Sequence, residues 1–168
     1  GDHTIDECRE KMSFVLTHLF GDLAIYRVDL KYVILKTAMV LSGKKSGVKA
    51  ESDDIANDTS HILMSTVPET IGGVVFLSGG QTPTESTLNL SKIMQHGPYK
   101  FPITYSYSRA LQDPVLEAFS KKTDIDQTRK IFIDRLEMNT LALEGKYTLD
   151  NETGLSSHIN NVTHSQDL

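Results

Sequence analysis

A run of apolar, mostly β-branched residues that ends in a glycine turn and a helix start most constrains the fold of this chain. Val74–Leu77 predicts a buried strand. It leads directly into the polar turn Ser78–Gln81, and Thr82–Glu85 then combines a capping box with proline at the first helical position. The pattern predicts a strand, a tight turn and a helix in direct succession, which is the unit of an α/β fold.

Two further segments show the same order. Val33–Leu35 predicts a strand that ends at Lys36, before a helix expected to have Ser52 as its N-cap. Pro102–Tyr105 predicts a third strand, before a helix expected from Ala110. Alternating strands and helices imply a parallel sheet with helices outside it, either an open sheet or part of a (β/α) barrel. In both architectures ligands bind at the carboxyl ends of the strands.

Helices are also expected on either side of these units. Ile5–Leu19 carries apolar residues at helical spacing behind a capping box of Thr4 and Glu7, and Gly21 is its expected end. A last helix is expected from about residue 126 to 144, with Gly145 after it.

Composition divides the chain into one folded region and a tail. Residues 1–147 hold the predicted strands and helices, whereas 148–168 contain few apolar residues and predict a flexible C-terminal tail. A complete eight-stranded barrel takes about 250 residues, so three strands would supply only part of one.

Charge and composition exclude several classes of function. The net charge of −5 argues against non-specific binding to nucleic acid or to anionic membranes. No apolar run is long enough to cross a bilayer, and the start of the chain does not resemble a signal peptide. The histidines are scattered and Cys8 is the single cysteine, so neither a metal site nor a disulfide is expected. These features predict a cytoplasmic protein.

Lys36 is a candidate nucleophile because it stands at the end of a predicted strand. Lysines in such positions commonly pack their stems and expose their ammonium groups, so position alone favours a structural role. A catalytic role requires the mouth of an apolar pocket, where a lowered pKa lets the amine attack a carbonyl. The position of Lys36 is compatible with both the structural and the catalytic role.

The turn after the second strand is a candidate anion site. Ser78, Gly79 and Gly80 present backbone N–H groups just before a helix, and the glycines let an anionic oxygen approach closely. Arg109, which follows Ser108 after the third strand, can add a planar guanidinium fork to the same anion. A glycine turn without a ligand and a surface arginine are the structural alternatives.

Seven short motifs together resemble class I fructose-bisphosphate aldolases, in the order and near the spacing of that family. They are Gly1–His3, Ile34–Val40, Thr66–Pro68, Val75–Gln81, Asn89–Leu90, Tyr105–Gln112 and Gly145–Tyr147. The resemblance runs from the first residue to about residue 147, and Phe-Leu-Ser-Gly-Gly-Gln is its most specific motif.

The resemblance implies the C-terminal part of a (β/α)8 TIM barrel and a lyase of glycolysis and gluconeogenesis. It implies that Lys36 forms a protonated Schiff base with fructose 1,6-bisphosphate. Reversible cleavage to dihydroxyacetone phosphate and glyceraldehyde 3-phosphate would then need no metal or other cofactor. The full-length form is expected to be a homo-oligomer. The residues implied to bind a substrate phosphate are Ser78, Gly79, Gly80, Ser108 and Arg109.

The chain also departs from the family pattern. Thr37 and Ala38 stand where the family usually has Pro-Asn, Ser108 replaces a glycine, and Leu168 replaces a terminal tyrosine. The acid–base residues of the family lie on strands that precede Gly1. Three interpretations follow: part of a glycolytic aldolase, a truncated non-catalytic paralogue that binds sugar phosphate or a protein partner, and a Schiff-base lyase with another phosphorylated substrate.

Overall fold

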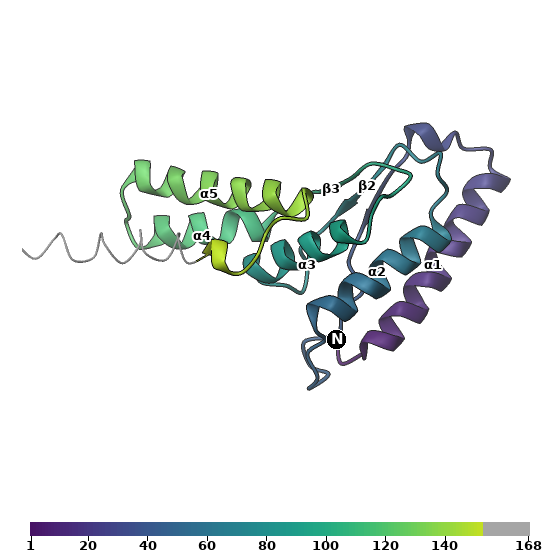
Figure 1. Cartoon of the computed structure of the whole chain (residues 1–168), viewed down its shortest axis with the longest axis horizontal. Coiled ribbons are helices and arrows are strands. Elements are labelled where there is room, and N and C mark those ends of the chain that lie inside the picture. Colours follow the sequence, from purple (N-terminus) through teal and green to yellow (C-terminus); the bar gives the residue numbers. More distant parts are fainter. Residues whose placement is uncertain (153–168) are drawn as a thin grey trace, which may run out of the picture.

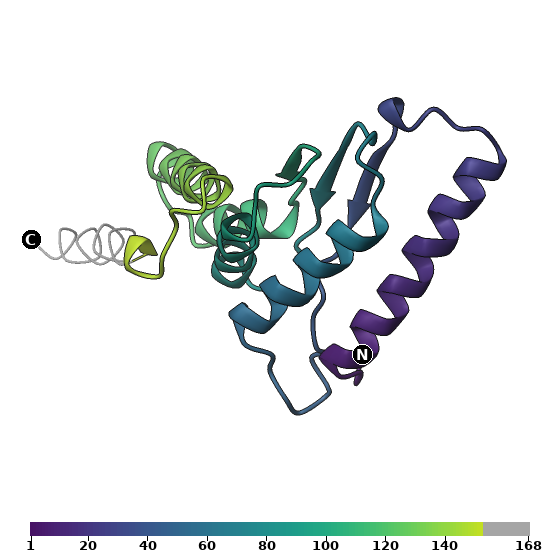
Figure 2. The same cartoon turned by 45° about the vertical axis from the view of Figure 1, so that its right-hand side comes forward.

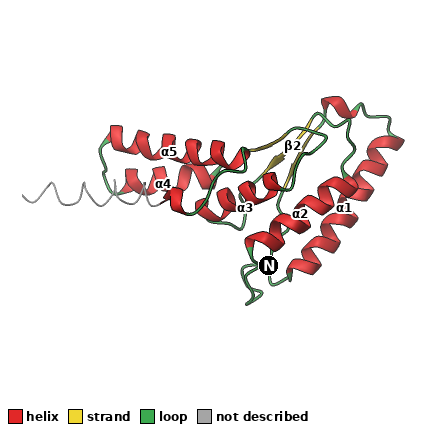
Figure 3. Ribbon diagram, in the orientation of Figure 1, coloured by secondary structure: helices red, strands yellow, loops and turns green. Residues whose placement is uncertain are grey.

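A three-stranded parallel sheet organises the chain (Figures 1 and 3). The computed structural model describes residues 1–152, so most of the predicted tail, 153–168, lies outside the described residues. The strands lie in the order β1 (Ile34–Thr37), β2 (Gly73–Phe76) and β3 (Ile103–Tyr105). This arrangement confirms the predicted α/β fold with a parallel sheet.

Each strand is followed by a helix, as predicted. The helices are α1 (Ile5–Ile25), α2 (Ser52–Thr66), α3 (Pro83–Gln95), α4 (Arg109–Ser120) and α5 (Ile125–Leu143), with a 3₁₀ turn η1 (Leu30–Tyr32) before β1. Helix α1 packs against α2, and α3, α4 and α5 pack against one another. Figure 2 shows α1 and the α4–α5 pair at opposite ends of the sheet.

The two faces of the sheet differ sharply in burial. Leu35, Val74 and Phe76 are buried in the core shared with α2 and α3. Side chains alternate along a strand, so their neighbours point the other way. On that second face Ile34 is 58% exposed, and Thr104 is exposed as well. No helix within residues 1–152 covers this face, which a closed barrel would hold in its interior.

Local signals at the helix ends were mostly confirmed. Thr4 begins α1 and Thr82 begins α3, each in a complete capping box with the glutamate three residues later. Gly145 follows α5 at φ 69°, the left-handed conformation that glycine adopts without strain.

Two boundary predictions were wrong. Helix α1 does not end at Gly21 but continues to Ile25, because a helix interior tolerates a single glycine at modest cost. Ser52 is the first residue of α2 and not its cap, since Glu51 occupies the cap position without a side-chain hydrogen bond.

A buried ion pair fastens the segment after α5 to the helices. Arg135 is 4% exposed, and its guanidinium donates to Glu152 Oε1 at 2.5 Å, to Pro83 O at 3.1 Å and to Thr87 Oγ1 at 2.6 Å. The Tyr147 hydroxyl also donates to Glu152 Oε1, at 2.5 Å. Burial, and then this hydrogen bond, raises the pKa of Tyr147. Residues 147–152 therefore return to α3 and α5.

Glu152→Gln should destabilise the chain, because the buried Arg135 guanidinium would lose its ion-pair partner within the described residues. We expect a loss of about 2 kcal/mol in the free energy of unfolding, measured by urea denaturation. The control is Glu117→Gln, which removes an exposed ion pair with Lys121 and should leave the free energy of unfolding nearly unchanged. Equal losses would show that the buried ion pair contributes no more to the free energy of unfolding than the exposed one.

Candidate active site

The carboxyl ends of all three strands meet at one edge of the sheet. The ladder continues past the strands, because Leu77 N–H donates to Thr37 O at 2.9 Å and Ser106 N–H donates to Phe76 O at 2.8 Å. The segments that carry the candidate residues are therefore held side by side. This is the edge at which parallel α/β folds bind ligands.

Lys36 projects from the uncovered face at this edge. The strand register places it in one row with Val75 and Thr104. Its Nζ donates to Ser106 Oγ at 3.2 Å, so the ammonium group reaches from β1 across β2 to the end of β3. Sequence reasoning did not select Ser106. The available signal was its place two residues after Thr104, which puts both on the same face.

The glycine turn and the β3–α4 loop lie against each other. Ser78 is buried, and its Oγ accepts a hydrogen bond from Ala110 N–H at 3.4 Å. A Cβ on Gly79 would stand 3.6 Å from Arg109 Nη2 and 3.0 Å from a methyl carbon of Leu77. Any side chain at residue 79 would therefore occupy the space beside the guanidinium.

Arg109 carries a positive charge that no residue of the described part of the chain neutralises. It is the first residue of α4, where the helix dipole disfavours a cation, and it is exposed. Within residues 1–152 its guanidinium has no hydrogen-bond or ion-pair partner. The corner of Ser78, Gly79 and Arg109 is thus electropositive and suited to an anion.

The other two predicted phosphate residues have local partners. Ser108 Oγ donates to Gln112 Oε1 at 3.1 Å, within the first turn of α4. Gly80 adopts φ 84°, and Gln81 N–H closes the turn on Ser78 O at 3.2 Å. Gly80 therefore shapes the turn that presents Ser78 and Gly79.

Tyr107 anchors the loop that carries Arg109. Its ring lies 5.1 Å from the Tyr105 ring, and its hydroxyl donates to Ser86 O on α3 at 3.0 Å. Burial raises the pKa of Tyr107, so the phenol stays neutral and keeps this hydrogen bond. The guanidinium of Arg109 is consequently attached to a loop that is fixed to the neighbouring βα unit.

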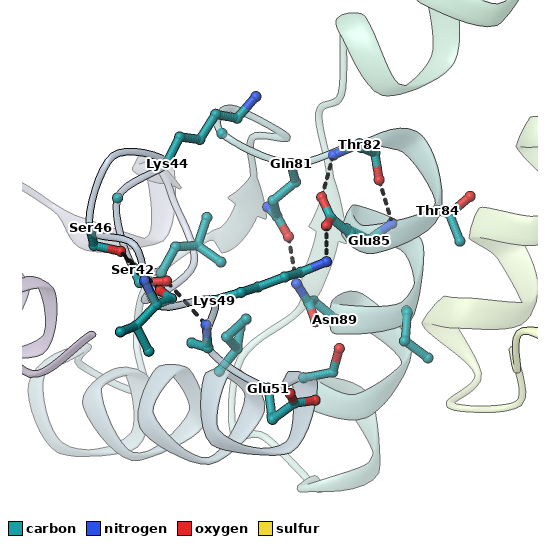
Figure 4. Close-up of a pocket in the computed structure, with 18 of the residues that line it drawn as sticks. Ser42, Lys44, Ser46, Lys49, Glu51, Gln81, Thr82, Thr84, Glu85 and Asn89 are labelled. Atoms are coloured by element: carbon teal, nitrogen blue, oxygen red, sulfur yellow. Dashed lines mark hydrogen bonds and ion pairs between the residues drawn. The ribbon is translucent and has the colours of Figure 1, made fainter. Parts of the chain in front are cut away.

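A cavity of about 830 Å³ lies beside the glycine turn, between the β1–α2 loop and the start of α3 (Figure 4). Lys49 spans it to form an ion pair with Glu85. Although burial opposes the shift, hydrogen bonds from Lys49 and Thr82 lower the pKa of Glu85. Beneath the ion pair Asn89 Nδ2 donates to Gln81 Oε1 at 2.7 Å. Lys49 and Glu85 therefore neutralise each other inside the cavity.

Within residues 1–152, no three His, Cys, Asp or Glu side chains gather closely enough to hold a metal ion. No helix in the same part of the chain has the length and apolar character needed to span a bilayer.

Comparison with known proteins decides the family. The family model described as fructose-bisphosphate aldolase class-I matches residues 1–166. The chain belongs to the class I fructose-bisphosphate aldolase family.

Aldolases of this family align with most of the chain. A probable class 1 aldolase of Xanthomonas campestris is 40% identical over 149 residues, which are 88% of this chain and 45% of that protein. A Dictyostelium discoideum aldolase is 36% identical over 94% of this chain and 44% of its own length. A solved Plasmodium falciparum aldolase superposes with a TM-score of 0.83 at 38% identity, covering 88% of this chain and 43% of that one. The chain thus spans less than half the length of these aldolases.

The loop between β1 and α2 depends on a close approach to residues 1–3. Gly43 N–H donates to His3 O and Lys45 N–H donates to Gly1 O, both at 2.8 Å. A Cβ on Gly43 would lie only 2.2 Å from Gly1 O. Glycine at this position therefore lets the two segments meet.

Gly43→Ala should detach this loop and lower the free energy of unfolding by about 1 to 2 kcal/mol, through the two lost hydrogen bonds. Gly21→Ala is the matched control, because nothing lies within 4 Å of its added Cβ and the residue lies inside α1. That change should stabilise the chain by about 0.5 to 1 kcal/mol. Thermal or urea unfolding measures both, and stabilisation by both substitutions would contradict the close approach.

Proposed function

We propose that this chain serves aldolase chemistry: the reversible cleavage of fructose 1,6-bisphosphate through a Schiff base on Lys36. One observation carries the proposal. The Lys36 amine lies on the uncovered face at the same strand edge as the electropositive corner of Ser78, Gly79 and Arg109. An amine and an anion site at one edge suit a ketone that carries a phosphate.

In the proposed reaction the unprotonated Lys36 amine attacks the ketone carbon, and the carbonyl oxygen leaves as water. The resulting iminium accepts the electron pair of the breaking carbon–carbon bond, while the hydroxyl on the departing carbon loses a proton and becomes the aldehyde. Ser106, which contacts Lys36 Nζ at 3.2 Å, would orient the amine. The groups that move protons would come from the strands that family members carry before the matched segment.

The electropositive corner of Ser78, Gly79 and Arg109, called the anion corner below, would hold one phosphate of the substrate. The backbone N–H groups of Ser78 and Gly79, with the Arg109 guanidinium, offer donors from two neighbouring loops. Gly80 would support the turn, and the hydroxyl of Ser108 would join only after leaving Gln112. We further propose a cytosolic protein that forms homo-oligomers in its full-length form; an Arabidopsis thaliana relative is named a cytosolic aldolase.

A second candidate is a non-catalytic paralogue that binds sugar phosphate. The uncovered sheet face favours it, because Lys36 is exposed there and lacks the apolar surroundings that a reactive lysine requires. The two candidates share the anion corner and differ in covalent chemistry at Lys36.

Borohydride trapping with dihydroxyacetone phosphate, read by peptide mass spectrometry, separates them. We expect a reduced adduct on Lys36 that is absent from Lys36→Met. Lys100→Met is the control, since Lys100 is an exposed lysine just before β3, at the other end of the strand. It should retain the adduct. A folded chain that gives no adduct on Lys36 would rule out aldolase chemistry for these residues alone and leave the non-catalytic paralogue.

A further inference from the structure

We propose that the cavity between the β1–α2 loop and α3 binds a neutral heterocycle through a cyclic amide edge, the adjacent ring N–H and C=O groups that a nucleobase carries. The groups that recognise this edge are the side-chain amides of Gln81 and Asn89, which both line the cavity. The inference goes beyond the proposed function, because neither the Lys36 amine nor the anion corner takes part in the site.

Two buried amide atoms at the cavity lack a hydrogen-bond partner. Asn89 is 2% exposed, and its Nδ2 donates to Gln81 Oε1 at 2.7 Å. Within the described residues, Asn89 Oδ1 and Gln81 Nε2 form no hydrogen bond, although both atoms are buried. An unpartnered buried polar atom is costly to the folded chain, and native structures contain few of them. A ligand that pairs with both atoms removes this penalty.

The pattern that a ligand must match does not depend on how the two amides are turned. An amide oxygen and nitrogen are told apart by their hydrogen bonds. Exchanging the two atoms in both side chains keeps the bond between Gln81 and Asn89 and again leaves one donor and one acceptor free. Because that bond joins the side chains, the free donor and acceptor are neighbours. Their complement is one acceptor beside one donor, as in a cyclic amide.

The charges around the cavity favour a neutral ligand. The charged side chains that line it are two of each sign, Lys44 and Lys49 against Glu51 and Glu85. Lys49 and Glu85 form an ion pair with each other. A balanced lining gives no net attraction for an anion, in contrast to the corner at Arg109.

Apolar side chains provide contacts for the faces of a ring. Leu41, Ile55 and Leu88 line the cavity from the β1–α2 loop, α2 and α3. A heterocycle can place its faces against these side chains and its edge against the two amides. A polyol would instead leave hydroxyl groups against apolar carbon without partners. The volume of about 830 Å³ is in the range of sites for small molecules.

The Lys49 side chain covers the amide pair. It crosses the cavity from the β1–α2 loop to Glu85 on α3, and Asn89 lies beneath it (Figure 4). The side chain is 78% exposed, and exposed ion pairs of this kind contribute little to stability. A ligand can therefore displace Lys49 from Glu85 at small cost and reach the two free amide atoms.

Titration of the 168-residue chain with uracil tests the site, with the side-chain NH₂ signals followed by NMR. We expect saturable binding with a Kd of about 1 mM or below. The NH₂ signals of Gln81 and Asn89 should shift in the same titration. The control ligand is 1,3-dimethyluracil, which keeps the ring but has no N–H donor and should bind about tenfold more weakly or worse. Absence of saturable uracil binding, or equal affinity for either the dimethyl compound or sorbitol, overturns the inference.

Amide variants locate the binding groups. Asn89→Leu should weaken uracil binding about tenfold or more, because it removes one of the two amides at similar side-chain volume. Asn57→Leu is the matched control, since Asn57 is exposed on α2 and is not among the lining residues, and it should leave the affinity unchanged. Circular dichroism of each variant checks folding, and Gln81→Met gives an independent second variant. Unchanged affinity in a folded Asn89 or Gln81 variant contradicts the assignment.

Lysine variants test the cover. Lys49→Ala should raise the affinity for uracil about threefold or more, because no ion pair then has to open. Lys92→Ala is its control: it removes a different ion pair of α3, with Asp53 at 2.8 Å, and Lys92 does not line the cavity. Weaker binding by Lys49→Ala would show that the Lys49 side chain supports the ligand and would overturn its role as a cover.

Competition with inorganic phosphate separates this site from the anion corner. The Gln81 side chain bonds to Asn89, whereas its backbone N–H closes the turn on Ser78 O. Saturating phosphate should therefore leave uracil binding unchanged, and displacement of uracil would place it in the anion corner and overturn the inference. Uracil binding without an imine adduct on Lys36 supports the amide site and contradicts the proposed reaction. An adduct without uracil binding has the opposite meaning for both.

Discussion

The alternation of side chains along three short strands determines the rest of this structure. Leu35, Val74 and Phe76 point toward α2 and α3 and bury the core. Because the period of a strand is two, the residues between them must point the opposite way. Lys36 is therefore directed away from the core by the same packing that buries Leu35. A shift of one residue in β1 would bury its charge, which is strongly unfavourable without a partner.

The candidate site follows from that constraint and from the loops at the strand ends. The carboxyl ends of β2 and β3 place the glycine turn beside Arg109, and Tyr107 ties the second loop to α3. The anion corner is formed by backbone geometry and one arginine, while the amine belongs to the uncovered face. Packing on one side of the sheet thus positions groups that act on the other.

Much of this arrangement could be predicted from the sequence because its signals are local. The capping boxes at Thr4 and Thr82 depend on residues three positions apart, and the β2 run is apolar enough to identify a strand. The order of strands and helices then restricts the sheet to parallel pairing. The end of α1 was missed because glycine at residue 21 is compatible with a helix interior as well as with a helix end.

Contacts between distant residues could not be predicted in the same way. The hydrogen bond from Lys36 to Ser106 spans 70 residues, and the ion pair of Arg135 with Glu152 joins α5 to a segment expected to be flexible. The residues that flank Ser106 and Glu152 in the sequence do not indicate either contact. The cavity beside α3 likewise depends on how the β1–α2 loop folds back to the start of the chain.

The most direct test of the account compares thiol labelling at two adjacent residues of β1. In a chain carrying Cys8→Ser, Ile34→Cys and Leu35→Cys would be prepared separately, since these side chains are 58% and 9% exposed on opposite faces. We expect rapid labelling of the variant at residue 34 and strong protection at residue 35. Similar labelling rates at the two positions would show that the sheet does not have one covered and one uncovered face, and would contradict the account.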